Sequence, residues 1–196
     1  MHLDDPSALL TTCAPSGLPL RGRFAELEAV THHLMNGRSI LLVGPDDIGK
    51  SAIASAVTVP GVTRRDPLAS VTRKDASQLR LSLDRGAVAL ATSRTSSARA
   101  IGAVRRILWR FRILTVRPLP AVAIRLVLRD VLIDDERLLR QVPARWWTEA
   151  IEAADGRPGY AVAIARAALD EWATHGRIAS PGLAMIDHRI ARAMAE

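Results

Sequence analysis

The spacing of hydrophobic and polar positions changes at Pro120. Before it, short apolar runs of strand length alternate with helical patterns, whereas after it the pattern is helical throughout. Alternating strands and helices followed by a run of helices predict an α/β core with a helical C-terminal lid. We expect a loosely ordered N-terminus over residues 1–19, an α/β core over 20–119 and a helical lid over 120–196.

Within the core, three apolar runs have the length of buried parallel strands. These runs are Ser39–Val43, Ala87–Ala91 and Arg112–Val116. Helices are expected over Phe24–Met35 (ending before Gly37), Lys50–Thr58 and Asp75–Leu83, the last opened by a capping-box pattern. The segment Val59–Lys74 contains Pro60, Gly61 and Pro67 and is expected to form a loop.

The helical part predicts five helices from its apolar periodicity. They are Ala121–Leu132, Glu136–Gln141, Arg145–Ala154, Tyr160–Thr174 and Leu183–Ala195. Trp146, Trp147 and Trp172 fall in this part and are expected to pack in its interior rather than to stack on bases.

Residues Gly44-Pro45-Asp46-Asp47-Ile48-Gly49-Lys50-Ser51 match the phosphate-binding pattern GxxxxGK(S/T). They follow a predicted strand and precede a predicted helix, which is the context this loop requires. Gly44 and Gly49 are expected to take positive φ and let the backbone approach a phosphate. Lys50 suits the β- and γ-phosphates, and the Ser51 hydroxyl suits Mg²⁺. The loop therefore predicts ATP and Mg²⁺ as cofactors, although two carboxylates, Asp46 and Asp47, are unusual beside a triphosphate.

The composition limits the remaining classes of function. A single cysteine, Cys13, excludes an internal disulfide framework and fits a reducing cytoplasm. No apolar run has the length of a membrane span and no secretion signal is visible, so we expect a cytoplasmic protein without a membrane partner. The net charge of +7 is carried by 25 arginines and two lysines, a ratio typical of a GC-rich genome.

Several segments together resemble AAA+ and STAND-type NTPases, including the ATPase modules of large LuxR-type transcriptional regulators. Leu20–Leu27 (LRGRFAEL) is similar to the family's box before the phosphate loop, which implies that Gly22 and Arg23 lie near the adenine. Ala87–Arg94 (AVALATSR) resembles the sensor strand, which implies that Thr92 and Arg94 lie near the γ-phosphate. Arg112–Leu119 and Gly156–Tyr160 resemble the entrance and the GxPxA segment of the family's helical lid.

One feature of that family is missing from its usual place. Active members carry an apolar strand ending in acidic residues before the sensor strand, and those acids hold Mg²⁺ and orient water. Only 28 residues separate Val59 from Val88 here, and none of their acids ends an apolar run. The sequence thus predicts that this strand is deleted and the parallel sheet reduced. An apolar run does lead to Asp134 and Asp135, which are alternative metal-holding acids or, more simply, the N-cap of the next helix.

The arginine block offers a further alternative. Nine arginines and no acid lie between Arg94 and Arg129, and Ala98–Arg112 mixes arginines with Trp109 and Phe111. This pattern fits a nucleic-acid surface, but it fits an amphipathic helix followed by a strand as well. The five histidines have no spacing that suits a metal site.

These observations predict a nucleotide-binding regulatory module linked to transcriptional regulation, in which ATP is bound rather than efficiently hydrolysed. Two alternatives stay open: an ATPase that uses Asp134 and Asp135, and an arginine-rich nucleic-acid-binding protein, with DNA as its partner. Loss of a central strand would expose sheet edges, so a protein partner or self-association is also expected.

Overall fold

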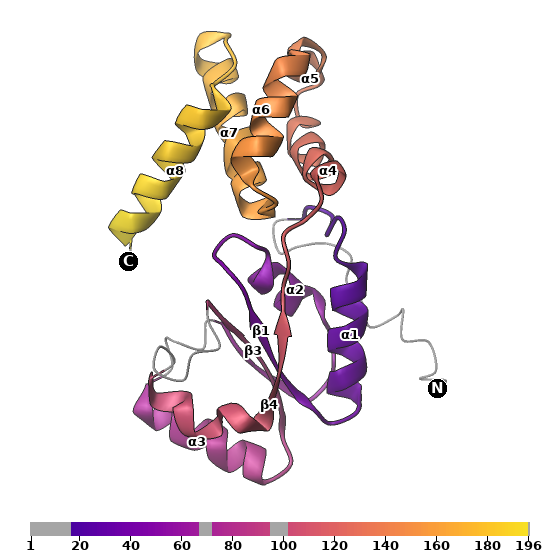
Figure 1. Ribbon diagram of the computed structural model, residues 1–196, viewed down its shortest axis with the longest axis vertical. Coiled ribbons are helices and arrows are strands. Elements are labelled where there is room, and N and C mark those ends of the chain that lie inside the picture. Colours follow the sequence, from indigo (N-terminus) through magenta and orange to yellow (C-terminus); the bar gives the residue numbers. More distant parts are fainter. Residues whose placement is uncertain (1–16, 67–71, 95–101, 196) are drawn as a thin grey trace. The chain divides into compact units, whose positions relative to one another are not determined.

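A computed structural model describes residues 17–66, 72–94 and 102–195 (Figure 1). The chain divides between Arg117 and Pro118 into two compact units, here called unit 1 (residues 1–117) and unit 2 (residues 118–196). The expected loose N-terminus lies outside the described residues up to residue 16, and so does Cys13. Among the described residues, no helix is long and apolar enough to cross a membrane.

Unit 1 is built on a parallel sheet of four strands in the order β2-β3-β1-β4. The strands are β1 (Ser39–Val43), β2 (Val62–Arg65), β3 (Val88–Ser93) and β4 (Phe111–Thr115). β1 is central and pairs with β3 through Ile40–Leu90 and with β4 through Leu41–Ile113. The fold class predicted from the sequence, an α/β protein with a parallel sheet and a helical C-terminal part, is therefore confirmed.

Helices cover both faces of the sheet, as Figure 1 shows. On one face lie α1 (Phe24–Met35) and α2 (Lys50–Ala56), and on the other lie α3 (Arg73–Asp84) and the 3₁₀ helix η3 (Gly102–Arg110). Because side chains alternate along a strand, Ile40 and Leu42 of β1 pack in the first layer and Leu41 and Val43 in the second. All five residues of β1 are consequently buried, as expected for the centre of a parallel sheet.

Unit 2 is helical and agrees closely with the periodicity of the sequence. Its helices are α4 (Ala121–Leu132), α5 (Glu136–Gln141), α6 (Ala144–Ala154), α7 (Pro158–His175) and α8 (Pro181–Ala195). Trp146 is buried as expected, and its indole N–H donates to the carbonyl of Ala179 at 2.8 Å. The Pro118–Leu119 entrance meets the Gly156 segment, where the Leu119 N–H donates to the Gly156 carbonyl at 2.8 Å.

The segment Val59–Lys74 was wrongly expected to be a loop. It contains β2, which pairs in parallel with β3 through Val62–Val88 and Thr63–Ala89. It also contains the start of α3, whose N-cap is Thr72 rather than a residue of the expected capping box; the Thr72 hydroxyl accepts from the Asp75 N–H at 3.2 Å. β2 escaped the pattern because two of its four residues are arginines, so it carries no apolar run.

The prediction that the strand before β3 is deleted is also wrong. A strand does occupy that place, namely β2, and the passage from α2 to β3 is shortened to one strand and one helix. The described sheet is therefore continuous from β2 through β3 and β1 to β4.

Candidate functional site

The phosphate-binding loop joins the carboxyl end of β1 to α2, and backbone contacts hold its first residue. The Gly44 N–H donates to the Ser93 carbonyl of β3 at 3.3 Å, and the end of β4 lies close to Gly44 as well. A Cβ on Gly44 would lie 3.0 Å from the Val116 carbonyl and 3.2 Å from the Ile48 side chain. Glycine is required at this position by that close approach. The expected positive φ is not found at Gly44; it is found at Gly49 (94°) and Asp47 (59°).

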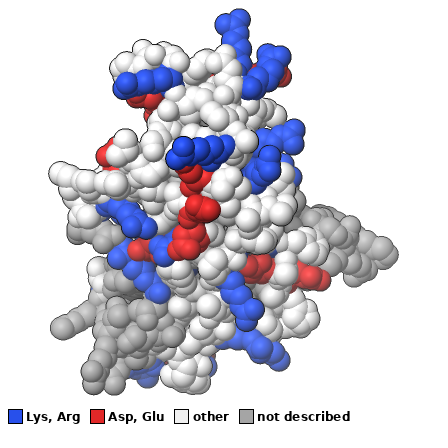
Figure 2. All heavy atoms as spheres, turned by 45° about the horizontal axis from the view of Figure 1, so that its top comes forward, with Lys and Arg blue, Asp and Glu red and all other residues white. Residues whose placement is uncertain are grey.

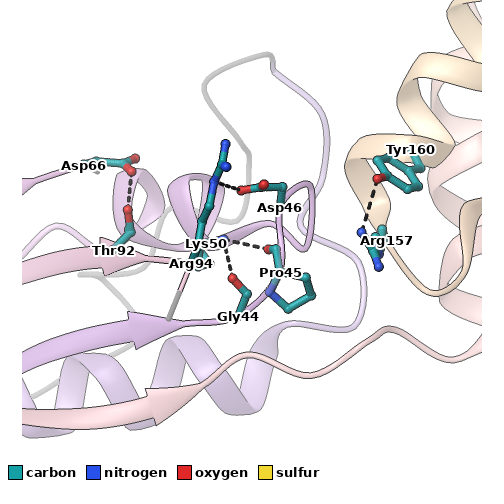
Figure 3. A network of polar contacts seen from close by, with 9 residues as sticks. All are labelled: Gly44, Pro45, Asp46, Lys50, Asp66, Thr92, Arg94, Arg157 and Tyr160. Atoms are coloured by element: carbon teal, nitrogen blue, oxygen red, sulfur yellow. Dashed lines mark hydrogen bonds and ion pairs between the residues drawn. The ribbon is translucent and has the colours of Figure 1, made fainter. Parts of the chain in front are cut away.

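Lys50 is the cation of the loop and is folded back onto it. Its side chain is 9% exposed, and its ammonium donates to the carbonyls of Gly44 (2.9 Å) and Pro45 (2.7 Å), as Figure 3 shows. Carbonyl oxygens are weaker partners for an ammonium than phosphate oxygens are. A phosphate at the loop would therefore offer the ammonium stronger acceptors than these two carbonyls.

Arg23 lies behind the loop as a buried bridge. It is 3% exposed, and its guanidinium donates to the Ile48 carbonyl (2.6 Å), the Arg117 carbonyl (2.8 Å) and the Glu26 carboxylate (2.7 Å). In a planar trans peptide the carbonyl and the next N–H point in opposite directions. Since Arg23 draws the Ile48 carbonyl to itself, the Gly49 N–H points the other way. Gly22, its neighbour, takes a positive φ of 68°.

Asp46, the first of the two unusual carboxylates, forms an ion pair with Arg94. The Arg94 Nε lies 2.9 Å from Asp46 Oδ1 (Figure 3), although the arginine side chain is 54% exposed. The structure thus brings together two residues that the sequence placed at the site separately. The pair also explains how the loop accommodates one acid, because a neighbouring cation offsets its charge.

Asp66 is a further candidate residue of this site that the sequence did not indicate. It directly follows β2, and its carboxylate accepts a hydrogen bond from the Thr92 hydroxyl at the end of β3 (Figure 3). The carboxyl ends of parallel strands share one sheet edge, so Asp66, Thr92 and the loop after β1 all belong to that edge. In the sequence, only the β-branched pair Val62–Thr63 indicates the strand β2. Nothing in the sequence indicates that Asp66 lies next to Thr92.

The other candidate acids, Asp134 and Asp135, lie in unit 2. The apolar run before them is the end of the helix α4 and not a strand. The Asp135 carboxylate accepts from the backbone N–H groups of Arg137 and Leu138, both at 2.9 Å, which makes it the N-cap of α5. Across the described part of the chain, no group of three or more His, Cys, Asp or Glu side chains is arranged to hold a metal ion.

The arginine-rich block is described from Gly102 onward, since residues 95–101 lie outside the described part. Trp109 at the end of η3 is 74% exposed, whereas Phe111 is buried in β4. On the face drawn in Figure 2, basic side chains are scattered, and acidic ones lie between several of them. The net charge of the chain therefore does not gather into one basic surface on that face.

Comparison with known proteins shows the fold. Neither a protein-family model nor a curated protein sequence matches the chain, but solved structures do. The RuvB Holliday junction branch migration motor of Thermotoga maritima matches with a TM-score of 0.54 and 14% identity over 91% of this chain and 71% of that one. Domain III of the replication initiation protein DnaA of the same organism gives 0.56 and 12%, over 84% of this chain and 90% of that domain.

A structure of katanin, solved to explain its self-assembly, gives a TM-score of 0.58 and 13% identity, over 84% of this chain and 73% of that one. Of another RuvB structure the chain spans 65%. These neighbours are AAA+ P-loop ATPases, and the chain therefore has the AAA+ fold. At such low identity the likeness concerns the fold alone.

Proposed function

We propose that unit 1 binds a nucleoside triphosphate, ATP being the expected one, at the carboxyl edge of its sheet. The observation that carries this proposal is the arrangement of the loop. Lys50 is held over it by two carbonyls, and Arg23 behind it turns the Gly49 N–H away from the core. An anion that accepts from these groups adds a charged acceptor, and its hydrogen bonds with the ammonium are stronger than those of the carbonyl oxygens.

Mg²⁺ fits the donors that this edge offers. The hydroxyl of Ser51 and the carboxylate of Asp66 are hard oxygen ligands of the kind Mg²⁺ prefers, and phosphate oxygens and water would complete its shell. We propose Asp66 for this role instead of Asp134 or Asp135, because Asp66 shares the sheet edge with the loop.

The same acid supports binding over hydrolysis. Asp66 is followed by Pro67 and preceded by Arg65, so it has no acidic neighbour in the sequence. Hydrolysis requires a group that positions the attacking water in addition to one that holds the metal. We therefore propose a regulatory module in which the bound nucleotide changes how the chain packs with a protein partner or with a second copy. The link to transcriptional regulation rests on the sequence resemblance to LuxR-type and STAND proteins.

The test compares the two lysines of the chain, Lys50 and the exposed Lys74. Saturating Mg²⁺-ATP should raise the melting temperature of the wild type by several degrees, because ligand at about 100 times its Kd adds roughly 2.7 kcal/mol. Lys50→Ala should abolish this shift and Lys74→Ala should keep it. Equal shifts in both variants would refute nucleotide binding at the loop.

Turnover is measured on the same samples as phosphate release. We expect the wild type to bind without sustained release, and Asp66→Asn to reduce the part of the thermal shift that depends on Mg²⁺. Rapid release that is lost in Asp134→Ala or Asp135→Ala would instead support the ATPase alternative.

A further inference from the structure

A hollow lies at the amino edge of the sheet in unit 1, opposite to the edge that carries the phosphate-binding loop. It has a volume of about 590 Å³ and opens between the starts of β1, β3 and β4. Its wall includes Arg38, Trp109, Arg110 and Arg112, together with Gly37 and Gly86. The residues proposed for nucleotide binding take no part in it.

The charge in this hollow is positive and only partly compensated. Arg110 pairs with Asp84 at 2.5 Å, and this carboxylate also lies 3.7 Å from Arg80. Arg38 and Arg112 are exposed, and within the described ranges neither has an acidic side chain at ion-pair distance. Two guanidinium groups therefore face solvent without a counter-charge.

A neighbouring histidine responds to this potential. The pKa of the half-buried His33 lies below its ordinary value of 6.5, first because its ring is desolvated and then because Arg112, His32 and Arg38 repel the protonated form. The same charges that disfavour an imidazolium favour an anion.

Trp109 adds an aromatic surface to the basic one. Trp109 as a residue is 74% exposed, although the guanidinium of Arg110 lies 4.2 Å from the centroid of its ring. An arginine stacked on one face of a tryptophan holds the ring in place and leaves its other face for a planar group.

We propose that this hollow binds single-stranded nucleic acid, with a base stacked on Trp109 and phosphates contacted by Arg38 and Arg112. The combination distinguishes this ligand from other polyanions. An acidic peptide would satisfy the arginines but would not need the free aromatic face, whereas successive bases use both. The inference is independent of nucleotide binding at the opposite edge.

The contribution of the bases is tested with two fluorescein-labelled probes read by polarisation. One is an oligothymidylate of about 12 nucleotides, and the other is an abasic strand of equal length, which keeps the phosphates. The wild type should bind the thymidylate at least about fivefold more tightly, the effect of one stacked base. Trp109→Ala should remove that preference. A preference that survives in Trp109→Ala, or none in the wild type, would overturn the assignment of the ring.

The contribution of the arginines is tested against a matched loss of charge. Arg38→Gln/Arg112→Gln is compared with Arg140→Gln/Arg145→Gln, which removes two exposed arginines from unit 2. The first double variant should lower affinity about tenfold or more and reduce the slope of log K against log salt by about 1.4, two phosphate contacts on a single strand. Equal losses in both variants would show that net charge alone attracts the strand.

Two further measurements separate the sources of binding. Lys50→Ala should bind the thymidylate as the wild type does, and a loss there would place the strand at the phosphate-binding loop. Polyglutamate should compete poorly; competition as effective as that of unlabelled thymidylate, at equal charge, would overturn the proposal in favour of an acidic protein partner.

Discussion

Replacing Arg23 by methionine tests whether this residue positions the phosphate-binding loop from behind. The substitution keeps an unbranched side chain of similar length, so packing is largely retained while the charge and the hydrogen bonds are lost. It removes the donors to the Ile48 and Arg117 carbonyls and leaves the Glu26 carboxylate without its partner. Removing one member of a buried charged network typically costs 3–5 kcal/mol.

The structure places the expected loss towards the low end of that range. The Nε of Arg23 is buried without a hydrogen-bond partner among the described residues, and such an unsatisfied donor already lowers the stability of the wild type. Glu26 is also only partly buried and can regain water. We therefore expect a loss of about 3 kcal/mol, a large fraction of the 5–15 kcal/mol by which proteins are stable.

Hydrogen exchange of the β1 amides is the appropriate assay, because these residues are buried and report the opening of unit 1. Arg23→Met should speed their exchange by about two orders of magnitude, the equivalent of 3 kcal/mol. Arg80→Met, which alters an exposed ion pair, should change it by less than about 0.5 kcal/mol. ATP-dependent stabilisation should fall as well, because the Ile48–Gly49 peptide is no longer held.

Arg23→Lys gives an additional comparison, since a lysine keeps the charge but cannot span two carbonyls and a carboxylate as the guanidinium fork does. Partial recovery of stability with little recovery of ATP binding would fit the proposed role. If Arg23→Met changes the exchange of the β1 amides no more than Arg80→Met does, the hydrogen bonds of Arg23 do not stabilise unit 1.

Three other predictions follow from single contacts. Asp46→Asn should tighten ATP binding severalfold in calorimetry, because it removes a negative charge beside the triphosphate and releases the arginine paired with it; weaker binding would show that the ion pair supports the loop. Gly156→Ala should destabilise unit 2 in urea by about 2–4 kcal/mol, because φ is +68° and a Cβ would lie 2.6 Å from the Cβ of Pro118. Gly176→Ala, with φ +65° and open space around it, should cost about half as much. Because the pKa of His33 is lowered by folding, the unfolded chain binds its proton more readily, so the urea midpoint should fall as pH is lowered from above 6.5 towards the folded pKa; His33→Gln should flatten this dependence, and a midpoint that rises on acidification would contradict it.

The helices could be read from the sequence because their burial is periodic, and the central strands because they form continuous apolar runs. α4 (Ala121–Leu132) and α5 (Glu136–Gln141) have the predicted bounds, and β1 (Ser39–Val43) is buried at every position. In these elements the apolar positions of the sequence are the positions that the fold buries. β2 could not be read, because an edge strand is half solvated and its sequence Val62–Arg65 is polar.

The candidate site divides in the same way. The loop from Gly44 to Ser51 could be predicted from the sequence because all of its characteristic residues lie within one short segment. The contact of Asp66 with Thr92 and the bridge made by Arg23 connect residues 26 and up to 94 positions apart. Such contacts depend on strand order and on the packing of the loop against the sheet. Neither can be predicted from the spacing of residues along a short segment.

The position of β2 changes how the shortened core is understood. A missing central strand would have exposed two apolar edges, whereas the described sheet ends in a short strand with Arg64 and Arg65, and charged residues on an edge discourage pairing with other chains. The described sheet thus gives less reason to expect a partner that covers its β2 edge. An acid is nevertheless present at the carboxyl edge of the sheet. Asp66 directly follows β2 and contacts Thr92, and the two residues before it are arginines. For the proposed function, the shortened core keeps Lys50 and Asp66 at one edge of the sheet, and Asp66 has no acidic neighbour in the sequence.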